Sequence, residues 1–372
     1  MRTAIVHDWF VSYAGSERVV ESFTNVWSDA DVFVLFNLLN ESDQKIVTKN
    51  KIPITSFLQK FSAIKRHHRK FLPIFPYAIE QFDLSNYDLI ISSSHAVAKG
   101  VLTSSNQLHI CYCHTPIRYA WDLTHQYLKE ANLNTGIKGM IAKSILHYIR
   151  IWDSSTANRP DFFIANSNYI AKRIQKIYKR DSAVIYPPVD TDKFKSEANK
   201  DDYYLTASRF VPYKRIDLIT EAFSKMPDRK LIIIGDGPEE DKIKSKSGSN
   251  IEFLGYKSGE ELVKYMQKAK AFVFAAEEDF GIMIVEALSC GTPVIAFSKG
   301  GASETIVDEE NGILYNEQTI ESIIDAVKRF ELRKEKFAPN LISNSAKKFD
   351  RKIFEDKIRE FVNVKYNDFF NS

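Results

Sequence analysis

Short apolar segments alternate with amphipathic helical patterns along almost the whole of this 372-residue chain. Patterns of period near 3.6, such as Ser16–Val26 and Arg215–Lys225, predict helices between the apolar segments. Alternation of strands and helices predicts βαβ units, and continuous apolar runs such as Leu231–Ile234 indicate strands covered on both faces. The sequence therefore predicts an α/β protein with parallel sheets. The expected strands are Thr3–His7, Asp31–Phe36, Tyr87–Ser92, His109–His114, Phe162–Asn166, Ala183–Tyr186, Tyr203–Ala207, Lys230–Gly235, Ile251–Gly255, Ala271–Ala275 and Pro293–Phe297.

Two adjacent prolines divide the chain into roughly equal halves. Pro187 and Pro188 directly follow a predicted strand, and proline can extend neither a strand ladder nor a helix. At roughly 100–200 residues per domain, the chain is long enough for two domains. We therefore expect an N-terminal domain over residues 1–187 and a C-terminal domain over residues 188–345. The charged amphipathic pattern of residues 346–372 predicts a final helix that packs back across the junction.

Composition excludes several classes of protein. The 51 basic and 48 acidic residues give a net charge of +3, which is too balanced for overall nucleic-acid binding. Three cysteines cannot form a disulfide framework and indicate a reducing compartment. No apolar run approaches the ~20 residues of a membrane-spanning helix, and the N-terminus lacks the pattern of a signal peptide. We therefore expect a cytoplasmic protein without a nucleic-acid partner.

Two glutamates follow the predicted strand Ala271–Ala275. Glu278 falls in the loop at the carboxyl end of that strand, and Glu286 falls in the next helix. Parallel sheets bind ligands at the carboxyl ends of their strands, and the backbone amides of Phe280 and Gly281 at the helix start favour anions or hydroxyls. Two carboxylates suit sugar hydroxyls. The alternative is an acidic helix start that only complements the helix dipole.

A second candidate site follows the predicted strand Tyr203–Ala207. Arg209 can form a two-pronged contact with a phosphate, and Lys214 can act as a point charge, so the pair can hold a diphosphate. Ordinary surface charge is the alternative. Gly235 begins a Gly-Asp-Gly-Pro turn at the end of a third strand, where a plain turn is the alternative to a ligand contact.

The first half offers fewer candidates. The loop after Thr3–His7 holds Gly15 where a dinucleotide fingerprint needs three glycines, which excludes nicotinamide or flavin binding of that type. Gly15 still allows a ligand to approach the backbone closely. His114 ends a predicted strand and is a candidate functional group. Cys111 and Cys113 lack zinc-finger spacing, so we expect buried free thiols and no metal site.

Together these motifs resemble those of a family-4 retaining glycosyltransferase of the GT-B fold. The resemblance covers nearly the whole chain and keeps the family's order and spacing. It implies two Rossmann-like domains facing a cleft, a nucleotide-sugar held mainly by the C-terminal domain, and neither a metal ion nor another cofactor. The motifs that carry it are EEDFGIMIVEALSCGTPVIA, SRFVPYKRIDLI, IIIGDGPEE, FLGY, ANSNYIAKRI and YPPVD.

The resemblance also implies roles for the candidate residues. Arg209 and Lys214 would bind the diphosphate and stabilise its departing charge. Glu286 would hold the ribose hydroxyls, Glu278 would hold the donor sugar, and His114 would sit near the anomeric carbon. The other donor-binding residues that the resemblance implies are Gly15, Gly235, Phe280, Gly281 and, in the base pocket, Tyr256.

The implied reaction is front-face displacement with retention, in which the leaving diphosphate takes the acceptor proton. Asp279 stands where the family usually has glycine, and the first loop has one glycine in place of two. The EDFG form, together with HTPIRYAWD from His114 onward, is similar to bacterial mannosyltransferases of surface polysaccharides and favours GDP-mannose as the donor. The alternatives are a UDP-sugar donor, a nucleotide-sugar epimerase and a non-catalytic nucleotide-sugar-binding partner.

Two windows of the first half, Gln44–Ile79 and Ala131–Trp152, contain no acidic residue. Apolar residues recur at helical spacing in Phe57–Leu72, which predicts a basic amphipathic helix at a membrane surface. A solvated basic helix is the alternative. A lipid-linked glycan acceptor would suit this patch, and the expected location is the inner face of the cytoplasmic membrane. Its basic residues are Lys60, Lys65, Arg66, Arg69 and Lys70, and the apolar residues at helical spacing in the second window are Ile137, Ile141, Ile145, Tyr148 and Trp152.

Overall fold

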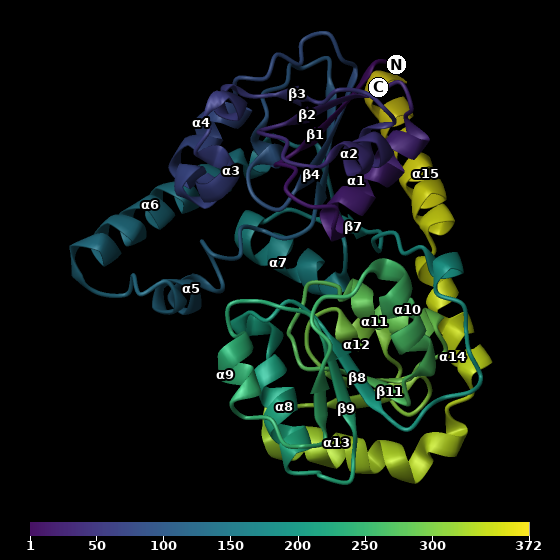
Figure 1. Ribbon diagram of the computed structural model, residues 1–372. Coiled ribbons are helices and arrows are strands. Elements are labelled where there is room, and N and C mark those ends of the chain that lie inside the picture. The colour runs from purple at the N-terminus through teal and green to yellow at the C-terminus, as the bar shows by residue number, and fades with distance from the viewer. Residues whose placement is uncertain (372) are drawn as a thin grey trace. The chain divides into compact units, whose positions relative to one another are not determined.

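The chain forms two compact units, each built around a parallel sheet, in a computed structural model that describes residues 1–371 (Figure 1). The first unit comprises Met1–Pro188 and the chain from Phe354 onward, and the second comprises Val189–Ile353. The chain thus passes from one unit to the other twice. The first passage falls within one residue of the position that Pro187 and Pro188 predict.

The first unit holds a seven-stranded sheet in the order β3-β2-β1-β4-β5-β6-β7, in which every pairing is parallel. The strand order reverses between β1 and β4, which is the kind of position where open parallel sheets bind ligands. The strands are β1 (Thr3–His7), β2 (Asp31–Val34), β3 (Ile54–Thr55), β4 (Leu89–Ser94), β5 (Leu108–Cys113), β6 (Phe162–Ala165) and β7 (Ser182–Val184).

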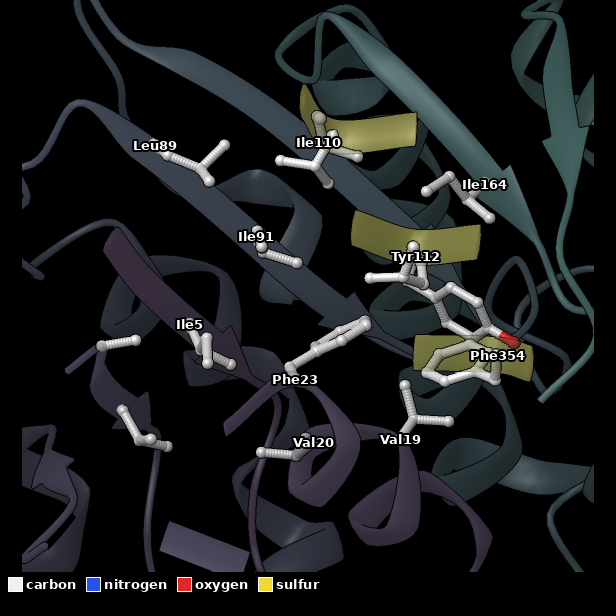
Figure 2. Packing of buried hydrophobic residues seen from close by; sticks show 14 of the residues in the cluster. Ile5, Val19, Val20, Phe23, Leu89, Ile91, Ile110, Tyr112, Ile164 and Phe354 are labelled. Carbon is white, nitrogen blue, oxygen red and sulfur yellow. The ribbon is translucent and has the colours of Figure 1, made fainter. Parts of the chain in front are cut away.

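Apolar side chains from the central strands form the core of this unit. Ile5 of β1 lies opposite both Val32 of β2 and Ile91 of β4, and all three are buried. Figure 2 shows Phe23, which packs on these strands, close to Tyr112 of β5. Burial on both faces explains why the central strands are continuous apolar runs in the sequence.

The second unit holds a six-stranded sheet in the order β10-β9-β8-β11-β12-β13, again with parallel pairings throughout. Here the strand order reverses between β8 and β11, so the segments after these two strands leave the sheet beside each other. The strands are β8 (Tyr204–Ala207), β9 (Leu231–Ile234), β10 (Ile251–Phe253), β11 (Ala271–Phe274), β12 (Val294–Phe297) and β13 (Gly312–Tyr315).

Helices connect the strands of both sheets (Figure 1). The helices of the first half are α1 (Gly15–Val26), α2 (Glu41–Thr48), α3 (Ile64–His67), α4 (Phe75–Ile79), α5 (Thr124–Glu130), α6 (Gly136–Ser155) and α7 (Asn168–Tyr178). Those of the second half are α8 (Ile216–Ser224), α9 (Glu240–Lys244), α10 (Gly259–Lys268), α11 (Ile282–Ser289), α12 (Ala302–Thr305), α13 (Ile320–Arg333), α14 (Pro339–Ala346) and α15 (Arg351–Asn371).

The α/β class and the parallel sheets are confirmed, and each predicted strand overlaps an observed one. Two strands were missed. Strand β3 contains only Ile54 and Thr55, which is too short to show a period, and β13 begins with a glycine that weakens the strand pattern.

The final helix begins later than residue 346, where the predicted segment starts. Helix α14 ends at Ala346, a 3₁₀ turn follows over Lys347–Phe349, and Asp350 is extended before α15 starts. Along α15, Phe354, Ile358 and Val362 recur every fourth residue and pack into the core of the first unit. The prediction that the last helix returns to the N-terminal half is thereby confirmed.

The two chain segments that connect the units, near Val189 and Arg351, are hydrogen-bonded to each other within the second unit. The amide of Val189 donates to the carbonyl of Phe349 at 3.0 Å, and the amide of Arg351 donates to the carbonyl of Val189 at 3.0 Å. The Arg351 guanidinium also donates to the Asp190 carboxylate. Although burial raises the pKa of Asp190, the hydrogen bond and charge of Arg351 lower it to about 2.

Candidate functional site

Three loops of the second unit meet at Gly235, directly after β9. Its amide donates to the carbonyl of Gly255 at 2.9 Å, and a Cβ atom at Gly235 would lie 1.8 Å from the carbonyl oxygen of Ser208. Its φ of +136° is also one that other residues rarely adopt. Only glycine therefore lets the loops after β8, β9 and β10 approach this closely. The structure thus gives Gly235 a packing role, and contact with a ligand stays a prediction.

The loop after β8 presents Arg209 and Lys214. Phe210 anchors this loop, since its ring is buried and its amide donates to the carbonyl of Asp236 at 2.6 Å. Arg209, the residue before it, is exposed. Lys214 ends a short 3₁₀ turn, and Arg215, with φ of +54°, reverses the chain into α8.

Lys214 and Glu278 form an ion pair, which joins two motifs predicted separately from the sequence. Their side chains are 19% and 17% exposed, so both groups are accessible but partly desolvated. The pairing follows from the strand order, because β8 and β11 are adjacent and their following loops leave the same edge. The structure therefore brings together two of the predicted donor-binding residues.

The loop that contains Glu278 packs closely against the loop that follows β12. The carbonyl of Glu278 accepts a hydrogen bond from the amide of Gly301 at 2.8 Å. A Cβ atom at Gly300 would lie 2.1 Å from that same carbonyl, and one at Gly301 would lie 2.2 Å from the carbonyl of Phe280. Two adjacent glycines, which were not among the predicted site residues, therefore fix the backbone position of Glu278.

Helix α11 begins directly after this loop. Gly281 precedes it with φ of +84°, and the buried ring of Phe280 packs edge to face on Phe349, with centroids 5.4 Å apart. Glu286 lies inside α11 and is only 4% exposed, whereas Tyr256 is 76% exposed. The ribose and base contacts predicted for Glu286 and Tyr256 stay predictions.

In the first unit, His114 follows β5 directly, as predicted. Its Nε2 lies 2.8 Å from the hydroxyl of Ser93 on the adjacent strand β4, and its ring packs on Tyr112 with centroids 5.2 Å apart. Burial and the nearby His95 lower the pKa of His114 to about 3, so its ring is neutral at physiological pH. Gly15 is the first residue of α1 and is half-buried. The roles predicted for His114 and Gly15 toward the donor stay predictions.

The surroundings of His114 were not predicted from the sequence. The rings of His7, His95 and His114, which we call the histidine cluster, have centroids 5.6 to 6.4 Å apart. Asp8 touches this cluster through a contact with His95. His7 ends β1, and the other residues directly follow β1, β4 and β5. No local sequence signal connects them, because Asp8 and His95 are 87 residues apart.

The segment Phe57–Leu72 is not the continuous amphipathic helix that its spacing predicts. It forms a 3₁₀ turn over Phe57–Lys60, the four-residue helix α3 and a second 3₁₀ turn over His68–Ile74 that contains Pro73. An extended residue at Phe61 and proline at position 73 interrupt the regular hydrogen bonds. The predicted basic residues are nevertheless all exposed, namely Lys60, Lys65, Arg66, Arg69 and Lys70.

The second acid-free window is largely the 20-residue helix α6, which packs beside the first window. Leu72 contacts a cluster that contains Leu146 and Ile149 of α6. Trp152 is buried and donates to Glu80 at 3.0 Å, so its expected place on a membrane-facing side was wrong. The exposed apolar residues of α6 are Ile137, Met140, Ile141, Tyr148 and Ile151.

Neither a metal-binding cluster nor a membrane-spanning helix is found in residues 1–371. No group of three or more His, Cys, Asp and Glu side chains in this part of the chain is arranged to hold a metal ion. No helix in the same range is long and apolar enough to cross a membrane. The three cysteines are buried free thiols, as expected.

Comparison with known proteins gives two matching family models. The model described as Glycosyltransferase Family 4 matches residues 13–193, and the model described as Glycosyl transferases group 1 matches residues 188–348. The two matches lie almost end to end, so together they cover the chain from residue 13 to residue 348.

Two curated relatives and one crystal structure illustrate the similarity. An uncharacterized glycosyltransferase of Methanocaldococcus jannaschii is 29% identical over 231 residues, which are 60% of this chain and 63% of that protein. A GDP-mannose-dependent alpha-(1-6)-phosphatidylinositol monomannoside mannosyltransferase of Mycolicibacterium smegmatis is 27% identical over 46% of this chain and 53% of its own. Both alignments span less than two thirds of the relative. The crystal structure of Anabaena HepE in complex with UDP matches 98% of this chain and 100% of its own, with a TM-score of 0.69 and 19% identity.

Proposed function

The chain belongs to the family 4 and group 1 glycosyltransferases and has their GT-B fold, and from this membership we propose that it transfers a sugar from a nucleotide-sugar to an acceptor. The contact between Lys214 and Glu278 carries the proposal. This contact supports the proposal because an ammonium group suits a diphosphate and the neighbouring carboxylate can accept hydrogen bonds from sugar hydroxyls. Arg209, exposed on the same loop, adds a second cation for the diphosphate.

The two cations also suit the chemistry of the transfer. When the bond between the anomeric carbon and the diphosphate breaks, negative charge grows on the diphosphate oxygen. A lysine and an arginine held at that position stabilise this charge more in the transition state than in the ground state. We propose that Arg209 and Lys214 supply this stabilisation, without a metal ion, and that the sugar is transferred with retention of configuration. The anomeric configuration of the product, measured by NMR, tests retention.

For the donor we propose GDP-mannose. The EDFG and HTPIRYAWD motifs support this choice, and the relative from Mycolicibacterium smegmatis is named as GDP-mannose-dependent. A UDP-sugar is the second candidate, because the Anabaena structure holds UDP on a fold that matches nearly the whole chain.

A thermal-shift panel with GDP, GDP-mannose, UDP, UDP-glucose and UDP-N-acetylglucosamine decides between these donors. A ligand at 100 times its Kd stabilises the folded state by about 2.7 kcal/mol. Stabilisation by the guanine nucleotides alone supports GDP-mannose, and stabilisation by the uridine nucleotides alone overturns that donor. If none of the five shifts the transition, the nucleotide-sugar proposal itself fails.

For the acceptor we propose a lipid-linked oligosaccharide of surface polysaccharide synthesis, used at the inner face of the cytoplasmic membrane. The basic segment Phe57–Leu72 and the exposed apolar residues of α6 support membrane contact, since they combine positive charge with apolar area. Extraction of the lipid fraction after incubation with a labelled donor tests the acceptor, because a soluble product only would exclude it.

Vesicle sedimentation tests the membrane contact. Replacing Lys65, Arg66, Arg69 and Lys70 by serine should weaken binding to anionic vesicles by at least tenfold at low salt, because each basic residue near the surface contributes roughly 1 kcal/mol. A control variant carries the same change of charge on the second unit, with serine at the exposed lysines 225, 244, 328 and 348. Equal binding by the two variants would contradict the proposal.

A further inference from the structure

Residues 115–123 lie between β5 and α5, and we call them the β5 loop. They contain most of the motif HTPIRYAWD and leave the first sheet at the carboxyl end of β5. Strand β5 pairs with β4, which is one of the two strands between which the strand order reverses. Ligands of open parallel sheets bind near such a reversal, at the carboxyl ends of the strands. The β5 loop is therefore at the edge of the first unit where a substrate is expected.

Helix α7 holds both ends of the β5 loop through one arginine. Arg173 is only 8% exposed, and its guanidinium donates to the hydroxyl of Thr115 at 3.0 Å. It also forms an ion pair with Asp122, in which Nε lies 2.6 Å from the carboxylate. A planar guanidinium can contact two groups at once, whereas the ammonium of a lysine is a point charge. Arg173 therefore joins the two ends of the loop.

Helix α6 holds the middle of the β5 loop. Arg150 donates to the carbonyl of Ala120 at 2.9 Å, and the indole of Trp121 donates to the Asp153 carboxylate at 2.7 Å. Asp153 is fully buried, so its charge requires hydrogen-bond donors, and the hydroxyl of Tyr178 is another donor at 3.0 Å. The backbone of the loop is thus held by side chains of two helices.

The hydroxyl of Tyr119, on the β5 loop, is buried and has no hydrogen-bond partner within residues 1–371. The residue as a whole is partly exposed, so it lies next to the surface. Burial raises the pKa of the phenol, so the hydroxyl keeps its proton and can donate. A buried hydroxyl without a partner is costly, and an oxygen of a ligand can supply the missing acceptor. Tyr119 is therefore a candidate for contact with a substrate.

The β5 loop packs beside the basic segment Phe57–Leu72. Ile117 and Ala120 of the loop belong to one apolar cluster, and Leu72 packs on the same cluster. Arg69 lies near Tyr119, because its positive charge counteracts the effect of burial on the pKa of the phenol. The loop thus adjoins the segment for which membrane contact is proposed, where a lipid-linked acceptor would approach the protein.

We propose that the β5 loop binds the acceptor, that the hydroxyl of Tyr119 donates to an oxygen of the acceptor glycan, and that Arg173 and Asp153 are positioning residues. This inference rests on the proposed function. The donor contacts proposed for Lys214 and Glu278 belong to the second unit, which leaves this edge of the first unit for the acceptor. A loop held by two helices loses less conformational freedom when a ligand binds, so the positioning residues should raise acceptor affinity.

The first test replaces Arg173 by lysine, which keeps the charge but cannot join both ends of the loop. Arg180→Lys is the matched control, because Arg180 also donates to two groups, the carbonyls of Ala157 and Asp161, and Asp161 precedes β6 at the opposite edge of the sheet. The acceptor probe is the lipid-linked oligosaccharide fraction of cells in which the gene for this chain is deleted. For Arg173→Lys we expect the acceptor KM to rise at least about tenfold, with kcat at saturating acceptor within about threefold. GDP affinity, measured by calorimetry, should stay within about twofold, and Arg180→Lys should leave all three quantities within about twofold of the wild type.

The second test, Tyr119→Phe, removes only the hydroxyl group. Because this hydroxyl has no partner within residues 1–371, its loss should leave Tm within about 2 °C of the wild type while the acceptor KM rises at least about fivefold. Tyr203→Phe is the matched control, since its buried hydroxyl donates to the carbonyl of Tyr265 at 2.8 Å. That variant should lower Tm and leave the acceptor KM within about twofold. A merely structural role of Tyr119 would instead give the pattern of the control.

An acceptor KM within about twofold of the wild type, in Tyr119→Phe or in a folded Arg173→Lys, overturns the inference while the transferase proposal stands. Should Arg173→Lys not fold, Tyr119→Phe decides alone. Hydrolysis of the donor in the absence of acceptor should be unchanged in both variants, and a parallel fall in hydrolysis also overturns a role limited to the acceptor. A wild-type protein that transfers no sugar to the lipid-linked fraction overturns the proposed acceptor and this inference together.

Discussion

The two units place functional groups at their sheet edges in different ways. In the second unit, loops carry Lys214 and Glu278 to one edge, and glycines hold the loop backbones in contact. In the first unit, a buried side chain contacts residues distant in sequence, since the Asp8 carboxylate accepts the backbone amide of His95. A site built from loop backbones leaves local sequence motifs, whereas a site built from side-chain pairs leaves none.

The units also differ in where their charges lie. Lys99 of the first unit is almost fully buried, and its ammonium lies 3.0 Å from the Asp153 carboxylate and donates to the hydroxyl of Thr156 at 2.6 Å. The Lys244–Glu240 pair of the second unit, at 2.7 Å, lies at the surface. All eight histidines of the chain also belong to the first unit. Buried polar networks should therefore dominate the response of the first unit to mutation and pH.

Removing the buried cation should have the largest effect on stability. Lys99→Met leaves the Asp153 carboxylate buried without its charge partner, and such a loss costs about 3–5 kcal/mol. Urea unfolding, followed separately for the two units, measures the change in the free energy of unfolding. Lys244→Met is the control, since an exposed pair contributes about 0–1 kcal/mol. Equal losses of unfolding free energy in Lys99→Met and Lys244→Met would contradict the proposed contrast between buried and exposed charge pairs.

A single methyl group should test the loop contacts of the second unit. Gly235→Ala places a Cβ against the carbonyl of Ser208 and forces a left-handed backbone on alanine, so we expect a loss of about 3 kcal/mol. Gly259→Ala is the matched control, because nothing lies within 4 Å of its added Cβ. If Gly235→Ala melts within 2 °C of the control, the loop contacts are not as close as described.

Acid should weaken the first unit before the second. Burial lowers the pKa of His7, His109 and His114 from 6.5 to about 3. Below about pH 6.5 the imidazoles of the unfolded chain take up protons that the folded rings do not. The free energy of unfolding therefore decreases as the pH is lowered. At pH 5 the loss in free energy of unfolding is roughly 2 kcal/mol for each of these three imidazoles. Hydrogen exchange of each unit, measured between pH 7 and pH 5, gives the change in stability. An equal loss of stability in the second unit would contradict an origin in the histidines of the first.

The sequence predicts the second unit more completely than the first. The pairing of Lys214 with Glu278 follows from two local motifs and the adjacency of their strands. By contrast, Lys99 and Asp153 are 54 residues apart, and no pattern in either segment indicates the contact. The break in Phe57–Leu72 was missed for a related reason, because spacing alone cannot show which apolar residue turns inward to the core.

Of the changes considered, Lys214→Ala should have the smallest effect in free energy. Its comparison with His114→Ala tests what each unit contributes to catalysis. We expect at least a tenfold loss of kcat/KM, about 1.4 kcal/mol, together with weaker GDP binding, because the diphosphate loses a cation. His114→Ala, which removes a neutral ring of the first unit, should lower kcat and leave GDP affinity within about twofold. Calorimetry and initial rates separate the two variants. A His114→Ala protein that loses GDP affinity as Lys214→Ala does would mean that the nucleotide depends equally on both units.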